Sequence, residues 1–184
     1  MKFEETALPG AFIVSLEPHQ DERGFFSRAW CRKEFTDHGL SSELVQVDIS
    51  YNKRRGTLRG MHMQIAPSQE AKLVRVTQGR IFDVIIDARP DSPTFKQHFS
   101  VELNAVNRLA LYIPPGLAHG FLTLVDDSEI LYLMSDFYAP ELQRNLRWND
   151  PAFGIDWPFE PLHIKARDAE NPDWRVFIEK DLGL

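Results

Sequence analysis

Short segments in which apolar and polar residues alternate follow one another through the middle of this chain. A period of two is typical of a β-strand with one buried face, because successive side chains point to opposite sides of the sheet. Turn-forming residues separate the segments, for example at 89–93 (RPDSP) and 114–116 (PPG). Many short strands at this spacing predict a β-sandwich or barrel. The expected strands cover 44–51, 72–77, 80–87, 97–103, 109–113, 120–124 and 129–136, with a further strand through His62.

The two ends of the chain differ from this middle part. A short helix is predicted at 32–38, where Gly39 would end it. From about Tyr138 the alternation gives way to a tail rich in proline and aromatic residues. Such a tail is too aromatic for disorder, and we expect it to pack on the barrel or on a partner subunit through Trp148, Trp157 and Trp174. The prediction is one domain over 1–184, with a core at about 42–137 and with N-terminal strands and the tail at 138–184 as appendages.

Composition narrows the functional class. The chain has 184 residues, of which 43% are hydrophobic and 26% are charged, as is ordinary for a soluble globular protein. A net charge of −6 argues against a general nucleic-acid or anionic-membrane binder, but it allows a local basic pocket. Cys31 is the single cysteine, so an intramolecular disulfide is excluded and a reducing compartment suits the chain. Because no segment reaches the roughly 18 apolar residues that a membrane span needs, we expect a cytoplasmic protein.

The segment GTLRGMHMQ at 56–64 places a histidine in a predicted strand. Alternation puts His62 and Gln64 on one face of that strand, and Met61 and Met63 on the other. In two later strands a lysine and a tyrosine share a face with apolar residues, and a Pro-Gly turn leads into another histidine. If these faces line the interior of a barrel, the polar side chains meet in one cavity. They are His62, Gln64, Lys72, Tyr132 and His119.

Two spacings in this region resemble the motifs of the cupin superfamily. The first contains the H-x-Q pair at 62–64 and the second is PPGLAH at 114–119. Metal-binding cupins hold an ion with an H-x-H pair, a glutamate and the histidine of the second motif. Here Gln64 replaces the second histidine, and the ammonium of Lys72 would repel a cation. We therefore expect no metal and no other cofactor; the alternative is a cupin enzyme that binds an ion through His62, Glu70 and His119.

A closer resemblance covers the chain from about residue 3 to residue 173. Seven motifs occur in the order found in the dTDP-4-dehydrorhamnose 3,5-epimerase family, which this chain resembles throughout. They are DERGFF at 21–26, GTLRGMHMQ at 56–64, AKLVR at 71–75, IFDV at 81–84, DARPDSPT at 87–94, YIPPGLAHGF at 112–121 and RWNDP at 147–151. The resemblance implies a dimeric, metal-free cupin-like jelly roll. It also implies epimerisation of the carbons beside the 4-keto group of a nucleotide-diphospho-6-deoxyhexose.

The resemblance implies roles for individual residues as well. His62 would be the base that removes the proton next to the ketone, with Asp168 as its carboxylate partner. Lys72 would stabilise the enolate oxygen, although a structural ion pair with Glu70 is an alternative interpretation of this lysine. Tyr132 would return a proton to the opposite face of the carbon. Substrate contacts would come from Arg23 and Arg59 at the diphosphate, and from Phe26, His119 and Tyr138.

Several positions that would contact the substrate depart from the family pattern. The departures are Arg28 for a glutamate, Asp48 for an asparagine after Gln46, Gln143 for a glutamate, and Lys165 and Arg167 for a serine and a lysine. Arg28 reverses a charge and, unlike glutamate, cannot accept a hydrogen bond. Gln46, Arg28, Asp48, Gln143 and Arg167 stay candidate substrate-binding residues. Because the catalytic set is kept while its periphery differs, the sequence supports the reaction class more firmly than a particular nucleotide or sugar.

The expected substrate is dTDP-4-dehydro-6-deoxyglucose, converted to dTDP-4-dehydrorhamnose. An enzyme that epimerises one carbon only, or that acts on a CDP- or GDP-linked sugar, is the alternative. A non-catalytic sugar-nucleotide-binding cupin and a ketoisomerase are disfavoured, because a tyrosine faces a histidine across the predicted cavity. The expected protein partner is a second copy of the chain, in a homodimer that exchanges N-terminal strands and in which Arg23 would serve the partner's pocket.

Overall fold

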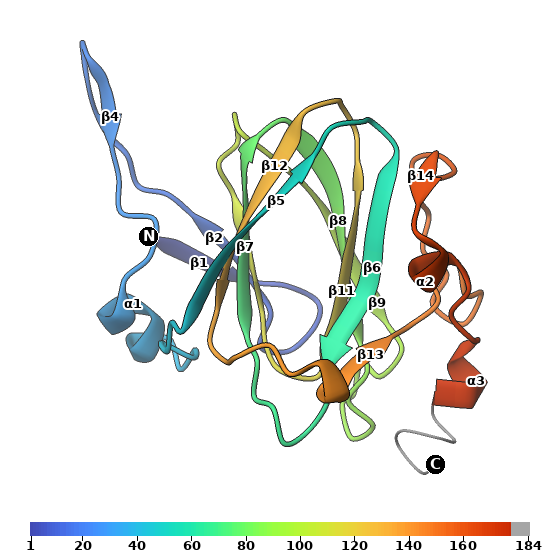
Figure 1. The fold of residues 1–184 in the computed structure, drawn as a ribbon. Helices are drawn as coiled ribbons and strands as arrows, with labels where there is room; N and C mark the ends of the chain where they lie inside the picture. The colour runs from blue at the N-terminus through green and yellow to red at the C-terminus, as the bar shows by residue number, and fades with distance from the viewer. Residues whose placement is uncertain (178–184) are drawn as a thin grey trace.

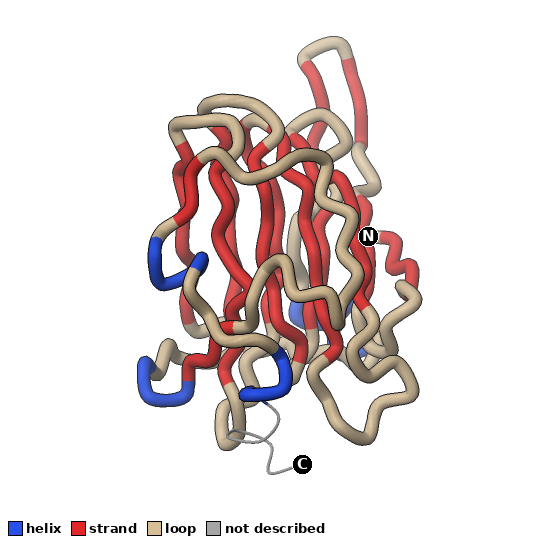
Figure 2. The backbone as a smooth tube through the Cα atoms, turned by 90° about the vertical axis from the view of Figure 1, so that its right-hand side faces the viewer, coloured by secondary structure: helices blue, strands red, loops and turns tan. Residues whose placement is uncertain are grey.

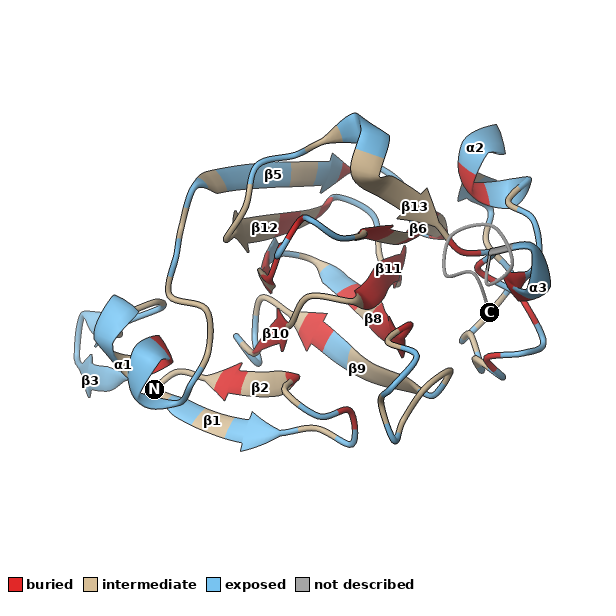
Figure 3. Cartoon of the chain, turned by 90° about the horizontal axis from the view of Figure 1, so that it is seen from below, coloured by how far each residue is buried: buried red, intermediate tan, exposed pale blue. Residues whose placement is uncertain are grey.

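The computed structural model describes residues 1–177 and contains two sheets that pack face to face (Figures 1 and 3). The first sheet runs in the order β1 (Lys2–Glu5), β2 (Phe12–Ser15), β10 (Ala110–Ile113), β7 (Lys72–Gln78), β12 (Ser128–Met134) and β5 (Gln46–Asn52). The second runs in the order β13 (Gln143–Asn145), β6 (Thr57–Gln64), β11 (Leu117–Thr123), β8 (Arg80–Asp87) and β9 (His98–Asn104). Neighbours are antiparallel, except that β14 (His163–Ile164) pairs with β6 in parallel. The predicted all-β jelly-roll sandwich is confirmed.

The predicted strands coincide closely with the observed ones, apart from β11. This strand begins at Leu117 rather than at 120, directly after the Pro-Gly turn. Gly116 has a φ of 84°, which a glycine adopts without strain, and the turn lets Leu117 pair at once with Asp87 of β8. His119 therefore lies inside a strand that is paired on both sides, and its side chain is firmly placed.

The inner faces of the two sheets form an apolar core. Val74, Leu111 and Ile130 from the first sheet pack in one cluster with Ile85 and Phe121 from the second, and each is at most 1% exposed. Burial of one such side chain stabilises the fold by roughly 1.5–3 kcal/mol. This cluster accounts for the alternation seen in the sequence, because the inward positions of the strands are the apolar ones.

The outer face of each sheet is covered by a different end of the chain. Helix α1 (Arg32–Asp37), predicted at 32–38, lies on the first sheet, where Phe35 packs edge-on against Tyr112. The tail crosses the second sheet (Figure 2) and contains η1 (Pro140–Leu142), α2 (Ala166–Ala169) and α3 (Trp174–Phe177). Among the described residues, no helix is both long enough and apolar enough to cross a bilayer.

The tail is fixed to the barrel by aromatic side chains. Trp174 is 3% exposed and packs edge-on against Phe153, in a cluster that also contains Met61 and Met63 of β6. The backbone N–H of Trp174 also donates a hydrogen bond to the buried carboxylate of Asp150. The predictions that the tail packs on the barrel, and that Met61 and Met63 face a packing layer, are confirmed.

One hairpin stands away from the barrel (Figure 1). It consists of β3 (His19–Asp21) and β4 (Gly24–Phe26), which pair with each other and with no other strand of the described residues. All six strand residues are exposed, and the Phe26 side chain is among the most exposed apolar groups of the protein. Burial within this chain therefore does not explain its apolar character.

Gly60 interrupts the alternation of β6. β11 pairs His119 with His62 and Phe121 with Arg59, so β6 has one more residue than β11 between these two pairs. Such a bulge changes the face toward which the side chains on one side of it point, relative to those on the other side. A Cβ at Gly60 would lie 2.5 Å from Cα of Gly120, and the φ of Gly60 is 138°, so only glycine fits here. As a result, Arg59 lines the same cavity as His62.

Candidate active site

A cavity of about 350 Å³ opens between the two sheets. His62 and Arg59 on β6 and His119 on β11 line it from the second sheet, whereas Lys72 on β7 and Tyr132 on β12 line it from the first. The other polar lining residues are Asp48, Ser50, Gln64, Glu70, Tyr138, Gln143 and Arg167. Packed sheets lie about 10 Å apart. A six-membered ring held between them would meet one set of groups on each of its faces.

His62 forms a pair with a carboxylate that the tail supplies. Its Nε2 lies 2.9 Å from Oδ1 of Asp168, which α2 carries. The Asp168 side chain is only 3% exposed, whereas 25% of the His62 side chain is exposed. An ionised carboxylate accepts hydrogen bonds but cannot donate them, so Nε2 of His62 is the donor and Nδ1 keeps its lone pair. This tautomer leaves His62 able to accept a proton at Nδ1.

A second histidine–carboxylate pair lies beside the first. Nε2 of His119 is 2.7 Å from Oδ1 of Asp83, which is fully buried. Burial raises the pKa of Asp83, and the adjacent His119 opposes that shift. Sequence reasoning assigned no role to Asp83. The available signal was an acidic residue at an inward position, between Ile81 and Ile85 of an apolar strand.

Lys72 forms an ion pair inside the cavity. Its Nζ lies 3.1 Å from Oε2 of Glu70, and the two side chains are 14% and 5% exposed. The ion pair considered from the sequence is therefore present. An ammonium group has three donors, so Lys72 can bind Glu70 and an oxygen of a ligand at the same time.

Tyr132 is held in its protonated form. Burial raises the pKa of its phenol, nearby Asp83 raises it further, and Arg59 opposes the shift. The ring lies edge-on to the imidazole of His119, with 6.0 Å between the ring centroids. A phenol in this environment keeps its proton at neutral pH and can give it only to a strong base.

Arg59 is oriented by a buried amide. Its Nε donates to Oδ1 of Asn52 at 2.7 Å, and Asn52 is only 2% exposed. The Asn52 amide in turn donates to the carbonyl oxygens of Ser50 and Ser128. The two terminal nitrogens of the guanidinium are then available for an anion, a geometry that suits phosphate oxygens.

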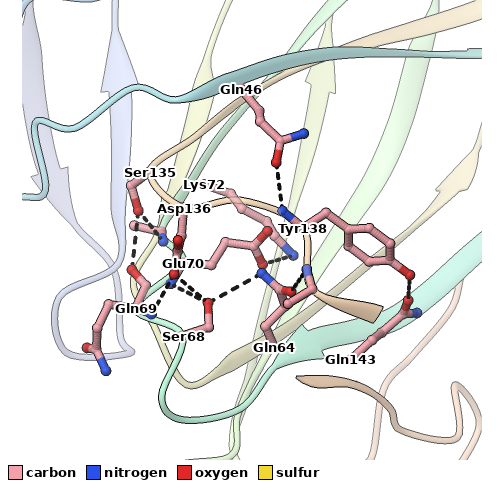
Figure 4. Close-up of polar contacts among 12 residues, drawn as sticks. Gln46, Gln64, Ser68, Gln69, Glu70, Lys72, Ser135, Asp136, Tyr138 and Gln143 are labelled. Atoms are coloured by element: carbon pink, nitrogen blue, oxygen red, sulfur yellow. Dashed lines mark hydrogen bonds and ion pairs between the residues drawn. The ribbon is translucent and has the colours of Figure 1, made fainter. Parts of the chain in front are cut away.

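Tyr138 lines the cavity and is hydrogen-bonded to polar side chains (Figure 4). The Tyr138 hydroxyl donates to Oε1 of Gln143, and the Gln143 amide donates to Asn145. Gln46 is not part of the cavity lining; its Oε1 accepts a hydrogen bond from the backbone N–H of Tyr138.

The residues of the alternative metal site each have a charged partner of their own. His62 is bound to Asp168, His119 to Asp83, and Glu70 to Lys72. Within residues 1–177, no three histidine, cysteine, aspartate or glutamate side chains lie close enough to share an ion.

Comparison with known proteins identifies the family. A model of the dTDP-4-dehydrorhamnose 3,5-epimerase family matches residues 5–175. The chain belongs to this family. The epimerase of that name from Salmonella typhimurium is 41% identical, over 91% of this chain and 92% of that protein. A solved epimerase of Mycobacterium tuberculosis has 37% identity and a TM-score of 0.92, over 99% of this chain and 92% of that one.

Another solved relative is named for epimerisation of one carbon instead of two. It is a 3′-monoepimerase from Streptomyces bikiniensis in complex with dTDP-quinovose. It has 33% identity and a TM-score of 0.88, and the match covers 97% of this chain and 90% of that one. As a member of the dTDP-4-dehydrorhamnose 3,5-epimerase family, the present protein is an isomerase on a cupin-like jelly roll.

Three residues that the family resemblance predicts at the substrate lie outside this epimerase's own cavity. Arg23 sits at the tip of the projecting hairpin, 83% exposed, and binds Asp21. Phe26 ends the same hairpin, and Arg28 forms an ion pair with Glu34 of α1. The other predicted residues line the cavity, except for Asp168 and Gln46, which bind lining residues.

Proposed function

We propose that this epimerase inverts both carbons beside the 4-keto group of a nucleotide-diphospho-4-keto-6-deoxyhexose. The proposed substrate is dTDP-4-dehydro-6-deoxyglucose and the product is dTDP-4-dehydrorhamnose. The observation that carries the proposal is a carboxylate-bound histidine, His62, on one sheet and the phenol of Tyr132 on the facing sheet of one cavity. Inversion needs a base on one face of a carbon and an acid on the other. The names of the relatives describe the same chemistry.

His62 is the proposed base. The C–H bond next to the ketone breaks, its proton moves to Nδ1 of His62, and its electron pair forms the enolate. Asp168 stabilises the resulting imidazolium through the 2.9 Å hydrogen bond to Nε2. Base catalysis of this kind contributes about 10²–10⁴-fold to a rate.

Lys72 and Tyr132 complete the proposed reaction. The ammonium of Lys72 binds the enolate oxygen, where a fixed charge in a partly dry cavity stabilises the developing negative charge. The phenol of Tyr132 then protonates the carbon from the opposite face and becomes a phenolate. Proton exchange with solvent returns the imidazolium and the phenolate to their starting forms. His119, held by Asp83, lies beside Tyr132 and is the proposed contact for the sugar.

We assign the diphosphate to the arginines that line the cavity. Arg59 binds Asn52 through Nε, which leaves its terminal guanidinium nitrogens for the ligand, and Arg167 of the tail lines the same cavity. We propose that Arg23 completes this subsite from a second copy of the chain. The exposed hairpin supports this, as does the outer face of β5, where Val47, Ile49 and Tyr51 are all more than half exposed.

Two variations of the reaction have specific support. Epimerisation of a single carbon is supported by the similarity to the 3′-monoepimerase. A different nucleotide is supported by Asp48 and Gln143, which line the cavity where the family pattern has other residues. A metal-dependent reaction has less support, because Glu70 is already paired with the ammonium of Lys72 and residues 1–177 contain no group of three side chains that could share an ion.

Deuterium incorporation tests the proposal. The purified protein is incubated in D2O with dTDP-4-dehydro-6-deoxyglucose and, separately, with the CDP- and GDP-linked sugars, and NMR follows the protons at C3 and C5. We expect exchange at both carbons of the dTDP sugar. Exchange at one carbon indicates a monoepimerase, and preference for CDP or GDP reassigns the base. If no sugar nucleotide incorporates deuterium, the proposal is wrong.

A mixing experiment tests the shared subsite. Arg23→Ala and His62→Ala proteins are each expected to be nearly inactive as homodimers, which sedimentation would detect as dimers. If Arg23 serves the partner's pocket, a mixed dimer contains one intact site, and random exchange restores about a quarter of wild-type activity. No restoration after verified subunit exchange means that Arg23 does not act in the partner's site.

A further inference from the structure

Gln64 lies two residues after His62 on β6, in the position where a metal-binding cupin has a ligand histidine. We propose that Gln64 and Gln46 are positioning residues, which hold the segment 136–139 so that Tyr138 forms a fixed wall of the substrate cavity. The inference rests on the proposed function for the identity of the ligand. It assigns Gln64 a part in substrate affinity and none in proton transfer.

Both donors and the acceptor oxygen of the Gln64 side-chain amide form hydrogen bonds to this segment or to Ser68, which supports it. Oε1 accepts a hydrogen bond from the backbone N–H of Ala139 at 2.7 Å, and Nε2 donates to the carbonyl oxygen of Phe137 at 3.2 Å. Nε2 also donates to Oγ of Ser68 at 3.3 Å. One side-chain amide thus forms hydrogen bonds to the peptide groups on both sides of Tyr138 (Figure 4). Gln64 is 7% exposed, so water competes little for these bonds.

Gln46 binds the N–H of the Phe137–Tyr138 peptide group, whose carbonyl oxygen binds Gln64. Its Oε1, on β5, accepts a hydrogen bond from the backbone N–H of Tyr138 at 2.6 Å. Asp136, two residues before Tyr138, is also fixed, because its carboxylate accepts hydrogen bonds from Ser68 and from the backbone N–H of Gln69. Side chains from two strands and one loop therefore replace the ladder of backbone bonds that would hold an ordinary strand.

The side chain that this arrangement positions is not part of the core. Tyr138 is 52% exposed and Phe137 is 66% exposed. Side chains held for packing are normally buried, because burial is what stabilises them. Tyr138 instead lines the cavity, as do Asp48 and its hydrogen-bond partner Gln143. A rigid aromatic wall loses little conformational entropy when a planar ligand group settles against it.

Glutamine is the residue that this geometry requires. The site needs one acceptor for the Ala139 N–H and one donor for the Phe137 carbonyl, and an amide supplies both. An ionised glutamate offers acceptors alone and would repel the Phe137 carbonyl. A methionine of similar length offers neither strong group. The pair of His62 and Asp168 does not involve Gln64, so a substitution there leaves the base and its partner in place.

Gln64→Met, Gln64→Glu and Gln46→Met are the test variants, with Gln69→Met as the matched control. Gln69 lies in the adjacent loop and takes part in this network only through its backbone. We expect both Gln64 variants to raise KM for the sugar nucleotide and Kd for dTDP by about tenfold or more. Their kcat should stay within about threefold of wild type, since the proton-transfer groups are unchanged. Gln69→Met should behave as wild type.

Amide hydrogen exchange separates failure of this inference from failure of the proposed function, because it needs no substrate. The Tyr138 and Ala139 amides should exchange slowly in the wild type and at least about tenfold faster in Gln64→Met. A folded Gln64→Met protein with wild-type exchange and wild-type Kd overturns the proposal, as does a fall in kcat at constant KM. If Gln64→Met does not fold, Gln46→Met decides by the same readouts.

Discussion

Replacement of Asp168 by asparagine tests whether this carboxylate sets the tautomer of His62, the proposed base, and stabilises its imidazolium form. The change keeps the shape of the side chain, which is 3% exposed, and removes its charge. An asparagine amide can donate to Nε2 of His62, and that bond favours the tautomer with its proton on Nδ1. The proton would then occupy the nitrogen that should accept one from the substrate. Asp168→Asn therefore removes the partner of the imidazolium and also favours the inactive tautomer.

The expected size of the effect follows from the hydrogen bond. A hydrogen bond to a charged group contributes about 1.5–3 kcal/mol, and about 1.4 kcal/mol corresponds to a tenfold change in rate. We expect kcat to fall roughly 10–150-fold from this bond alone, which is at most the lower end of the 10²–10⁴-fold contribution of a general base. KM should change less than kcat, because Asp168 does not line the cavity and reaches the substrate subsites only through its 3.6 Å contact with Nε of Arg167.

The assay is single-turnover deuterium exchange with the sugar nucleotide that the wild-type protein accepts. The matched control is Asp87→Asn, since Asp87 is also buried and hydrogen-bonded but binds Arg89, Ser92 and Thr94 instead of a cavity residue. This control should lower the melting temperature and leave kcat unchanged. A kcat of Asp168→Asn within twofold of wild type, in a protein that melts normally, would refute the reasoning.

Three further predictions concern other groups. Tyr132→Phe should keep deuterium exchange, because His62 can still remove and return a proton on one face, while inversion falls by about 10²–10⁴-fold; NMR distinguishes the two products. Arg59→Met should weaken dTDP binding by roughly 10–100-fold in calorimetry, as expected for loss of hydrogen bonds to a charged group, with Lys53→Met as an exposed control. Burial raises the pKa of Asp87, but hydrogen bonds from Arg89, Ser92 and Thr94 lower it by more, so the pKa lies below its ordinary value. The stability that Asp87 contributes is therefore present above its unfolded-state pKa of about 3.9 and is lost as pH falls through the lowered value. Acid unfolding monitored by circular dichroism should be less steep in Asp87→Asn.

Much of the fold could be predicted because its strands have one apolar face. The alternation in β7 and β12 placed Lys72 and Tyr132 inward, beside Val74 and Ile130, and the structure has them there. The same rule separated His62 from Met61. A periodic pattern shows on which face of a strand a side chain lies. In a sandwich, the side chains on the inner faces of the two sheets meet between the sheets.

The parts of the site that could not be predicted depend on contacts between distant segments. Strict alternation would place Arg59 with Met61, and only the bulge at Gly60 turns it inward. The pairing of Asp83 with His119 depends on the register between β8 and β11, which no local pattern encodes. The amide of Asn52 that orients Arg59 is likewise a contact that tertiary structure creates.

The two halves of the proposed base come from different parts of the molecule. The barrel holds the imidazole of His62, and α2 of the tail supplies the carboxylate of Asp168. Segments that dock on a folded body can open locally at a lower free energy than the body itself needs to unfold. On gradual warming, activity should therefore fall before the barrel unfolds. Activity then reports whether the tail is docked on the barrel. The temperature at which activity is lost can therefore differ from the temperature at which the barrel unfolds.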